Sequence, residues 1–173
     1  GKITLKNTIP EHLSAVIDKL IEVGADIVID KNDITIKRAK KINAVDVTTA
    51  VFPGFATDLQ AQWIALMSIA TRSSIVIDTI YHDRFSHVPE LNRLGANITV
   101  EGNTAIVRGV KELIGAKVRS TDIRASASLI LAGLMAKGVT EVSHIHYIDR
   151  GYEQIENKLT LLGAKIKRVS IDN

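Results

Sequence analysis

The chain has 173 residues, of which 46% are hydrophobic and 24% charged, with a formal net charge of +3 and no cysteine. These values fit one globular domain of ordinary size, and they exclude disulfides, cysteine-ligated zinc and thiol catalysis within this chain. Aromatic residues make up only 4%, too few for a surface that stacks nucleic-acid bases, and no apolar run is long enough to span a bilayer. The mild basicity suits anionic small molecules at least as well as nucleic acid.

The first predicted elements are a strand, a helix and a hairpin. The alternation in KITLK favours a strand almost at the first residue, so we expect the chain to be a piece of a larger protein. Apolar residues then share one helical face over 11–22, and Gly24 is a typical helix stop. The alternating segment VGADIVID and its return, ITIKR, predict a β-hairpin.

The segment FPGFATDLQAQ, residues 52–62, leads a Pro-Gly turn into an apolar helix. Capping explains this order on position alone. Thr57 would be the N-cap, and Asp58 would lie in the first turn, where the positive end of the helix favours an anion. The helix, AQWIALMSIA, has almost no polar face, so we expect it to be buried on all sides. A strand follows and is predicted to end in YHDR at 81–84.

The later elements repeat this order. A hairpin made of LGANITVE and TAIVR comes next, and TDIR at 121–124 opens a second apolar helix, ASASLILAGLMA. The strand after that helix is predicted to end in YIDR at 147–150. A third copy of the glycine-led strand, LGAKIKRV, occupies 162–169.

Two motifs therefore recur along the chain. The glycines Gly24, Gly95 and Gly163 lie 71 and 68 residues apart, and the two TD motifs, at Thr57 and Thr121, lie 64 apart. The pattern indicates a unit of strand, helix, strand, helix, strand, strand, present about two and a half times. Because the apolar helices need burial and the alternating strands suit sheets wetted on one face, we predict an α/β fold with helices at the centre and sheets outside.

The repeat gives two equivalent places where charged residues gather. The start of the buried helix and the end of the following strand carry Asp58, Asp122, Arg124, Asp83-Arg84 and Asp149-Arg150. If these places converge, helix N–H groups and arginines would face one anion. The alternative is that each arginine forms a structural salt bridge with its neighbouring aspartate, and the residues alone leave both interpretations open.

Two histidines raise the question of a metal site. His144 and His146 are predicted to lie on one face of a strand, as zinc ligands can, but no third ligand has a recognisable spacing. We therefore expect no metal site. No phosphate-binding loop or dinucleotide motif is found either.

Three stretches closely resemble the UDP-N-acetylglucosamine 1-carboxyvinyltransferase family: PGFATDLQAQ, TDIRASASLILAGLMAKG and YIDRGYEQIENKLTLLGAKI. The resemblance covers nearly the whole chain from about residue 5. It implies a cytoplasmic bacterial enzyme of peptidoglycan synthesis that needs no cofactor. Such an enzyme moves the enolpyruvyl group of phosphoenolpyruvate to the 3′-hydroxyl of UDP-N-acetylglucosamine through a tetrahedral intermediate, and releases phosphate.

The resemblance also implies an architecture. The family fold consists of two inside-out α/β barrels built from βαβαββ units, with the active site in the cleft between the two lobes. Residues 1–173 would form one lobe. The N-terminal lobe, a mobile loop that carries an acid, and a short N-terminal segment that completes the third unit would be missing. The isolated chain is therefore expected to be inactive.

By motif, the resemblance makes Asp58 the general base beside the sugar hydroxyl and a substrate contact. Ile80, just before YHDR, would contact the nucleotide-sugar through its backbone. Ala56 stands where proline is common in the family.

The resemblance assigns further substrate contacts to four charged residues. Arg84 and Arg150 would contact the part of the substrate derived from phosphoenolpyruvate. Arg124 would lie near the same pocket, and Asp122 would help to organise it. Two alternatives are a lobe of another enolpyruvyl transferase, such as 5-enolpyruvylshikimate-3-phosphate synthase, and a non-catalytic module that keeps the fold.

Overall fold

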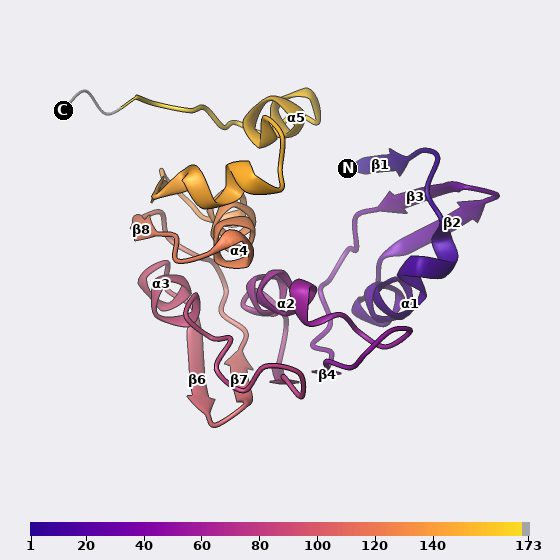
Figure 1. Ribbon diagram of the computed structural model, residues 1–173, viewed down its shortest axis with the longest axis horizontal. Helices are drawn as coiled ribbons and strands as arrows, with labels where there is room; N and C mark the ends of the chain where they lie inside the picture. The colour runs from indigo at the N-terminus through magenta and orange to yellow at the C-terminus, as the bar shows by residue number, and fades with distance from the viewer. Residues whose placement is uncertain (171–173) are drawn as a thin grey trace.

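The computed structural model describes residues 1–170, and Figure 1 shows two helices near the centre with sheets around them. The central helices, α2 (Gln60–Met67) and α4 (Ile123–Met135), pack against each other and carry much of the buried core. Around them lie a three-stranded, a four-stranded and a two-stranded sheet. This arrangement confirms the predicted α/β fold, with central helices and sheets outside.

The first part of the chain is half a repeat unit. Its elements are β1 (Lys2–Leu5), η1 (Pro10–Leu13), α1 (Ser14–Val23), β2 (Asp26–Asp30) and β3 (Asp33–Lys37). The strands form an antiparallel sheet in the order β1-β3-β2. Gly24 ends α1 with φ +106°, in the left-handed region that glycine tolerates. The predicted helix stop and the first hairpin are confirmed.

The middle of the chain is a complete unit. Its elements are β4 (Val47–Thr48), η2 (Thr57–Leu59), α2, β5 (Ser73–Ile77), α3 (Val88–Arg93), β6 (Asn97–Glu101) and β7 (Thr104–Arg108). The sheet order is β4-β5-β7-β6, with β4 parallel to β5 and the other pairs antiparallel. The predicted order of strands and helices is confirmed for this unit.

The last part of the chain departs from the prediction at its end. Its elements are β8 (Lys117–Arg119), α4, β9 (Glu141–Ser143), η3 (Ile145–Arg150) and α5 (Ile155–Leu161), with β8 parallel to β9. The predicted strand at 162–169 is wrong, because these residues form no ladder in the described chain. In the complete unit the corresponding strand, β6, pairs only with β7, the strand that returns after it. No such return strand follows residue 169 within the described part of the chain.

The two DR motifs lie after their strands and not at the strand ends. β5 ends at Ile77, so YHDR lies in the loop that follows, and YIDR lies in the 3-10 helix η3. The prediction that His144 and His146 share a strand face is also wrong, since β9 ends at Ser143. His144 adopts φ +58° at the start of η3, where the chain turns sharply.

The two central helices differ in how completely they are buried. In α2, Trp63, Ile64 and Met67 are among the most buried side chains of the protein. In α4 the first half is buried, but Leu131 is 40% and Leu134 is 38% exposed. The expectation that α4 is covered on all sides is therefore wrong for its second half. Within residues 1–170, every helix is too short or too polar to cross a bilayer.

Candidate active site

The candidate site lies where the start of α2, the start of α4 and the loop after β5 meet. A pocket of 410 Å³ opens there, lined by Tyr81, His82, Asp83, Arg84, Ser86, Asp122 and Arg124. Asp58, in η2, stands beside it through contacts to two of these residues. The site thus combines residues from two neighbouring repeat units.

Asp58 is the link between the two units. Its Oδ1 accepts a hydrogen bond from Arg84 Nη1 at 3.1 Å and one from Arg124 Nε at 2.6 Å. The side chain is 68% exposed, so the carboxylate is open to solvent and to a ligand. In the described chain neither Asp58 nor Thr57 caps a helix with its side chain, and the N-cap of η2 is Ala56. The predicted capping by Thr57 is therefore wrong.

Arg84 is held on three sides. Its Nη1 donates to Thr57 Oγ1 at 3.0 Å as well as to Asp58, and its guanidinium lies 3.8 Å from the centre of the Tyr81 ring. Stacking on an aromatic face and paired hydrogen bonds both exploit the planar shape of the group. The alternative prediction, a salt bridge to the neighbouring Asp83, is not found among the ion pairs of the described residues.

Asp122 performs the capping task at the equivalent position of the next unit. It is the N-cap of α4, and its Oδ1 accepts from the backbone N–H groups of Arg124 and Ala125. Burial alone would raise the pKa of Asp122. These two bonds, one from Ser86 and the charge of Arg124 outweigh burial, so the pKa lies below its usual range. Asp122 is therefore an ionised residue that fixes the start of α4, and with it Arg124.

Ile80 lies in the loop between β5 and Arg84. Its backbone N–H donates to Asp78 Oδ1 at 3.0 Å. Its carbonyl oxygen has no hydrogen-bond partner in residues 1–170, so that oxygen is the backbone group left for a ligand.

Arg150 is not brought into contact with the other predicted site residues. It ends η3, which packs on α4, and its guanidinium lies 5.7 Å from the Tyr147 ring centre. A Cβ on the next residue, Gly151, would lie 2.6 Å from Ile123, the first residue of α4, so Arg150 stands near the helix start. The alternative pairing with Asp149 is not found in the described chain, because Asp149 pairs instead with Arg168 at 2.7 Å.

Asp78 was missed by sequence reasoning. This residue follows β5, is 0% exposed, and accepts hydrogen bonds from the side chains of Thr49 and Thr57 and the backbone of Ile80 and Tyr81. Burial alone would raise the pKa of Asp78, but these four donors lower it below its usual range. Comparison of the repeat units does not point to Asp78, because the equivalent position of the next unit is His144 and not an aspartate. A charged residue directly after the apolar strand SSIVI was the available signal.

His87 is a second buried polar residue near the site. It is the N-cap residue of α3, and its Nε2 has no partner in the described chain. Burial lowers the pKa of His87 to about 4, although the charge of Asp122 opposes the shift. The side chain is therefore neutral at pH 7 and carries no charge to the site.

The arrangement suits an anionic ligand. Arg84 and Arg124 share the carboxylate of Asp58, and both line the pocket, so an anionic group of a ligand could take the place of that carboxylate on either arginine. Arginines recognise phosphate and carboxylate groups through paired hydrogen bonds. An exposed carboxylate beside them can accept a proton from a bound hydroxyl. Residues 1–170 contain no group of three or more side chains placed to hold a metal ion.

Comparisons with known proteins show the family of the chain. Residues 1–159 match the model of the EPSP synthase (3-phosphoshikimate 1-carboxyvinyltransferase) family. The UDP-N-acetylglucosamine 1-carboxyvinyltransferase of Myxococcus xanthus is 51% identical over 168 residues, which are 97% of this chain and 40% of that protein. The enzyme of the same name from Chloroherpeton thalassium is 53% identical over 172 residues, 99% of this chain and 40% of that protein. The chain spans about 40% of the length of these relatives.

Solved structures agree as well. The enolpyruvyl transferase NikO from Streptomyces tendae superposes with a TM-score of 0.81 at 29% identity, covering 90% of this chain and 36% of NikO. An EPSP synthase from Acinetobacter baumannii superposes with a TM-score of 0.63 at 17% identity, covering 82% of this chain and 34% of that one. The second match supports the fold alone.

Proposed function

Because this chain belongs to the EPSP synthase family of enolpyruvyl transferases, we propose that it forms one lobe, residues 1–173, of a UDP-N-acetylglucosamine 1-carboxyvinyltransferase. The complete enzyme would transfer the enolpyruvyl group of phosphoenolpyruvate to the sugar 3′-hydroxyl for peptidoglycan synthesis, in the bacterial cytoplasm. The observation that carries the proposal is the contact of Asp58 with Arg84 and Arg124 beside the 410 Å³ pocket. Identity near 50% to relatives of that name supports this member of the family over the others.

The contacts of Asp58 suggest how a substrate would change the site. In the structure Asp58 is the anion that Arg84 and Arg124 hold. The phosphate or carboxylate of phosphoenolpyruvate would compete for these arginines, with Arg150 as a further cation near the start of α4. Asp58 would then be free to turn toward the sugar hydroxyl and accept its proton. The binding of one substrate would thereby prepare the base for the other.

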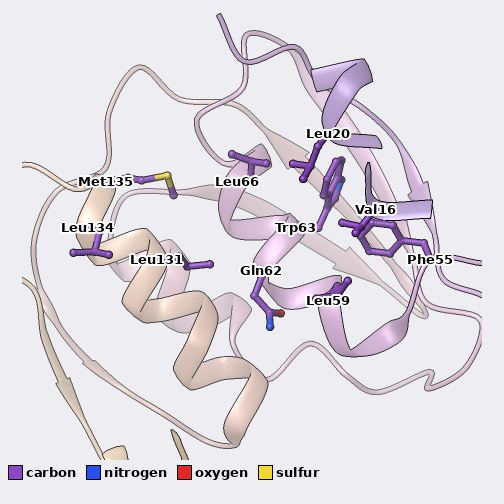
Figure 2. Close-up of a pocket in the computed structure, with 10 residues that line it drawn as sticks. All are labelled: Val16, Leu20, Phe55, Leu59, Gln62, Trp63, Leu66, Leu131, Leu134 and Met135. Atoms are coloured by element: carbon purple, nitrogen blue, oxygen red, sulfur yellow. The ribbon is translucent and has the colours of Figure 1, made fainter. Parts of the chain in front are cut away.

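An apolar groove supports the proposal that the lobe is completed by a segment outside residues 1–173. Figure 2 shows this groove, of 320 Å³, between α1, α2 and α4, with Val16, Trp63, Leu66 and Leu131 among its walls. Each of the two later units supplies one central helix, α2 or α4. The half unit that contains β1 and α1 has no central helix in its described residues. We propose that another part of the complete enzyme provides that helix and fills the groove.

The proposal is tested with the protein encoded by the natural reading frame that contains this chain. We expect it to release phosphate from phosphoenolpyruvate when UDP-N-acetylglucosamine is present. The 173-residue chain alone should give only the background rate, since a reaction in a cleft needs both walls. Activity with shikimate 3-phosphate in place of the nucleotide-sugar would instead identify the complete enzyme as a 5-enolpyruvylshikimate-3-phosphate synthase. Absence of turnover with either acceptor would overturn the proposal and leave a non-catalytic module.

A further inference from the structure

We propose that Asp78 is a positioning residue of this site: it fixes the proton of the Thr57 hydroxyl and, through that hydroxyl, the place of the Arg84 guanidinium. The inference rests on the proposed function and adds a residue outside the candidate substrate contacts. Asp78 is 0% exposed, so it touches no substrate and acts only through its neighbours.

Hydrogen-bond donors surround both oxygens of the Asp78 carboxylate. Oδ1 accepts from Thr49 Oγ1 at 2.8 Å, from the backbone N–H of Tyr81 at 2.9 Å and from that of Ile80 at 3.0 Å. Oδ2 accepts from Thr57 Oγ1 at 2.6 Å. A buried charge is costly unless donors surround it, and here four donors do so. The carboxylate thus joins β4, the start of η2 and the loop after β5.

The Thr57 hydroxyl has one proton to donate and two lone pairs with which to accept. The proton of Thr57 is donated to Asp78, because an ionised carboxylate can only accept. The free lone pairs of Thr57 Oγ1 are then available to Arg84 Nη1, which donates to them at 3.0 Å. Asp78 therefore makes Thr57 an acceptor toward Arg84.

The position of Arg84 depends on Asp78 through more than one contact. The contact with Thr57 is one of three that set its position, the others being Asp58 and the Tyr81 ring. Asp58 is exposed and, in the proposed mechanism, leaves Arg84 when substrate binds. The Tyr81 ring, in turn, depends on a loop whose backbone is held by Asp78. Two of the three contacts therefore trace back to the same buried carboxylate.

The exchange Asp78→Asn tests this directly because it keeps the size of the side chain and removes one acceptor. Asn can still accept from the backbone of Ile80 and Tyr81 with its oxygen. Its NH2 group would face Thr57, which must then accept and turn its own proton away. The direction of that proton would no longer be fixed by an acceptor, and in the orientation that faces Arg84 two donors would oppose each other, so the contact between Thr57 and Arg84 should weaken.

Three variants of the full-length enzyme are compared by steady-state kinetics. We expect Asp78→Asn to raise the KM for phosphoenolpyruvate about tenfold to a hundredfold, with less than about a threefold change for the nucleotide-sugar. Thr57→Val, which removes the hydroxyl and keeps the shape, should act in the same direction. The double variant should be no worse than Asp78→Asn alone, because both changes break one chain of contacts.

Thr49→Val is the matched control. Its hydroxyl also donates to Asp78, but to Oδ1, whereas the hydroxyl of Thr57, which accepts from Arg84, donates to Oδ2. We expect this variant to lower the melting temperature and leave the KM for phosphoenolpyruvate within about twofold of the parent. An equal rise of that KM in Thr49→Val would assign Asp78 a purely structural role and overturn the inference. Effects of Asp78→Asn and Thr57→Val that multiply in the double variant would also overturn it.

A second measurement does not depend on turnover. In the 173-residue chain, the Nε–H signal of Arg84 in a ¹⁵N-correlated NMR spectrum should shift in Asp78→Asn and in Thr57→Val, and stay in place in Thr49→Val. If the parent enzyme proves inactive with both substrates, the proposed function fails while this test still decides the positioning role. If Asp78→Asn does not fold, Thr57→Val carries the test, and an unmoved Arg84 signal there would contradict the inference.

Discussion

Asp58 and Asp122 occupy equivalent positions in neighbouring units and have different partners. Asp122 accepts two backbone N–H groups at the start of α4, whereas Asp58 accepts from the side chains of two arginines. The difference follows from position, because Asp122 is itself the N-cap of α4, whereas Asp58 lies inside η2, whose N-cap is Ala56. One aspartate therefore stabilises a helix start, while the other is available for chemistry.

We expect Asp58→Asn in the full-length enzyme to cut turnover by about 10² to 10⁴-fold, the usual contribution of a general base. The folded structure should change little, since the side chain is exposed and caps no helix within the described residues. Asn can still accept from an arginine but cannot take up a proton. The measurement is kcat at saturating substrates, with the melting temperature as the control. A variant that keeps more than about half of the parent kcat would refute the role of Asp58 as base.

Arg150→Ala should weaken the binding of phosphoenolpyruvate more than that of the nucleotide-sugar. Loss of a paired, charge-assisted contact in a closed site costs about 2 to 5 kcal/mol of binding free energy. The melting temperature should be nearly unchanged, because Asp149 is already paired with Arg168. Separate calorimetric titrations of the full-length enzyme with each substrate measure the effect. Equal losses for both substrates, or a lower melting temperature without a binding defect, would argue for a structural arginine.

His87→Gln should flatten the pH dependence of stability in the acid range. In the unfolded chain His87 takes up a proton near pH 6.5, but burial lowers the pKa in the folded protein to about 4. Between these values the unfolded state binds more protons, so the free energy of unfolding falls as the pH is lowered. The variant should lose about 2 kcal/mol less than the parent between pH 7 and pH 5.

Urea denaturation of the 173-residue chain at both pH values measures this difference. The carboxylates of Asp78 and Asp122 do not interfere, because each has a lowered pKa and so reduces stability only at more acid pH. Parallel pH profiles for parent and variant would show that His87 is not held neutral by burial.

At the scale of an element, β7 ends where two backbone segments approach closely. A Cβ at Gly109 would lie 1.8 Å from the carbonyl oxygen of Ala70, a backbone atom that cannot turn aside. We expect Gly109→Ala to lower the free energy of unfolding by about 3 kcal/mol. The control is Gly102→Ala, in the open turn between β6 and β7, where only the φ of +58° is unfavourable and about 1 kcal/mol is expected. Chemical denaturation that ranks the two variants equally would contradict the close approach.

The sequence predicted the elements whose signals are local. The helix before Gly24 and both hairpins follow from periodicity and turn residues, and they are confirmed by the structure. The prediction of a strand at 162–169 was wrong because a strand also needs a neighbouring strand to pair with, and the periodicity of a segment does not show whether one is present. The side chains of Arg84 and Asp58 were predicted as separate candidates. Their pairing across two units is a tertiary contact that spacing alone could not give.

At the scale of the whole molecule, the apolar groove predicts a contrast between the isolated chain and the complete enzyme. Leu131 is 40% exposed here, so Leu131→Glu should change the stability of the 173-residue chain by less than about 1 kcal/mol. In the full-length enzyme a covering helix would bury the new charge, and we expect a loss of about 2 to 3 kcal/mol. Thermal denaturation of both proteins measures the two effects.

Leu161→Glu is the control for that contrast. Leu161 lies on α5, is 89% exposed, and is distant in sequence from the groove residues. Its exchange should be neutral in both proteins. If Leu131→Glu were also neutral in the full-length enzyme, the groove would stay open there, and the proposal of a covering helix would be withdrawn.

The pairing of Asp58 with Arg124 has a consequence for ancestry. One residue belongs to the unit of β4 and α2, and the other to the unit of β8 and α4. A gene that encoded a single such unit could have made this pair only between two separate chains. In this chain both units lie on one polypeptide, and the equivalent aspartates differ: Asp122 caps a helix, while Asp58 keeps an exposed carboxylate. A substitution at either residue would therefore alter a contact that neither unit can make by itself.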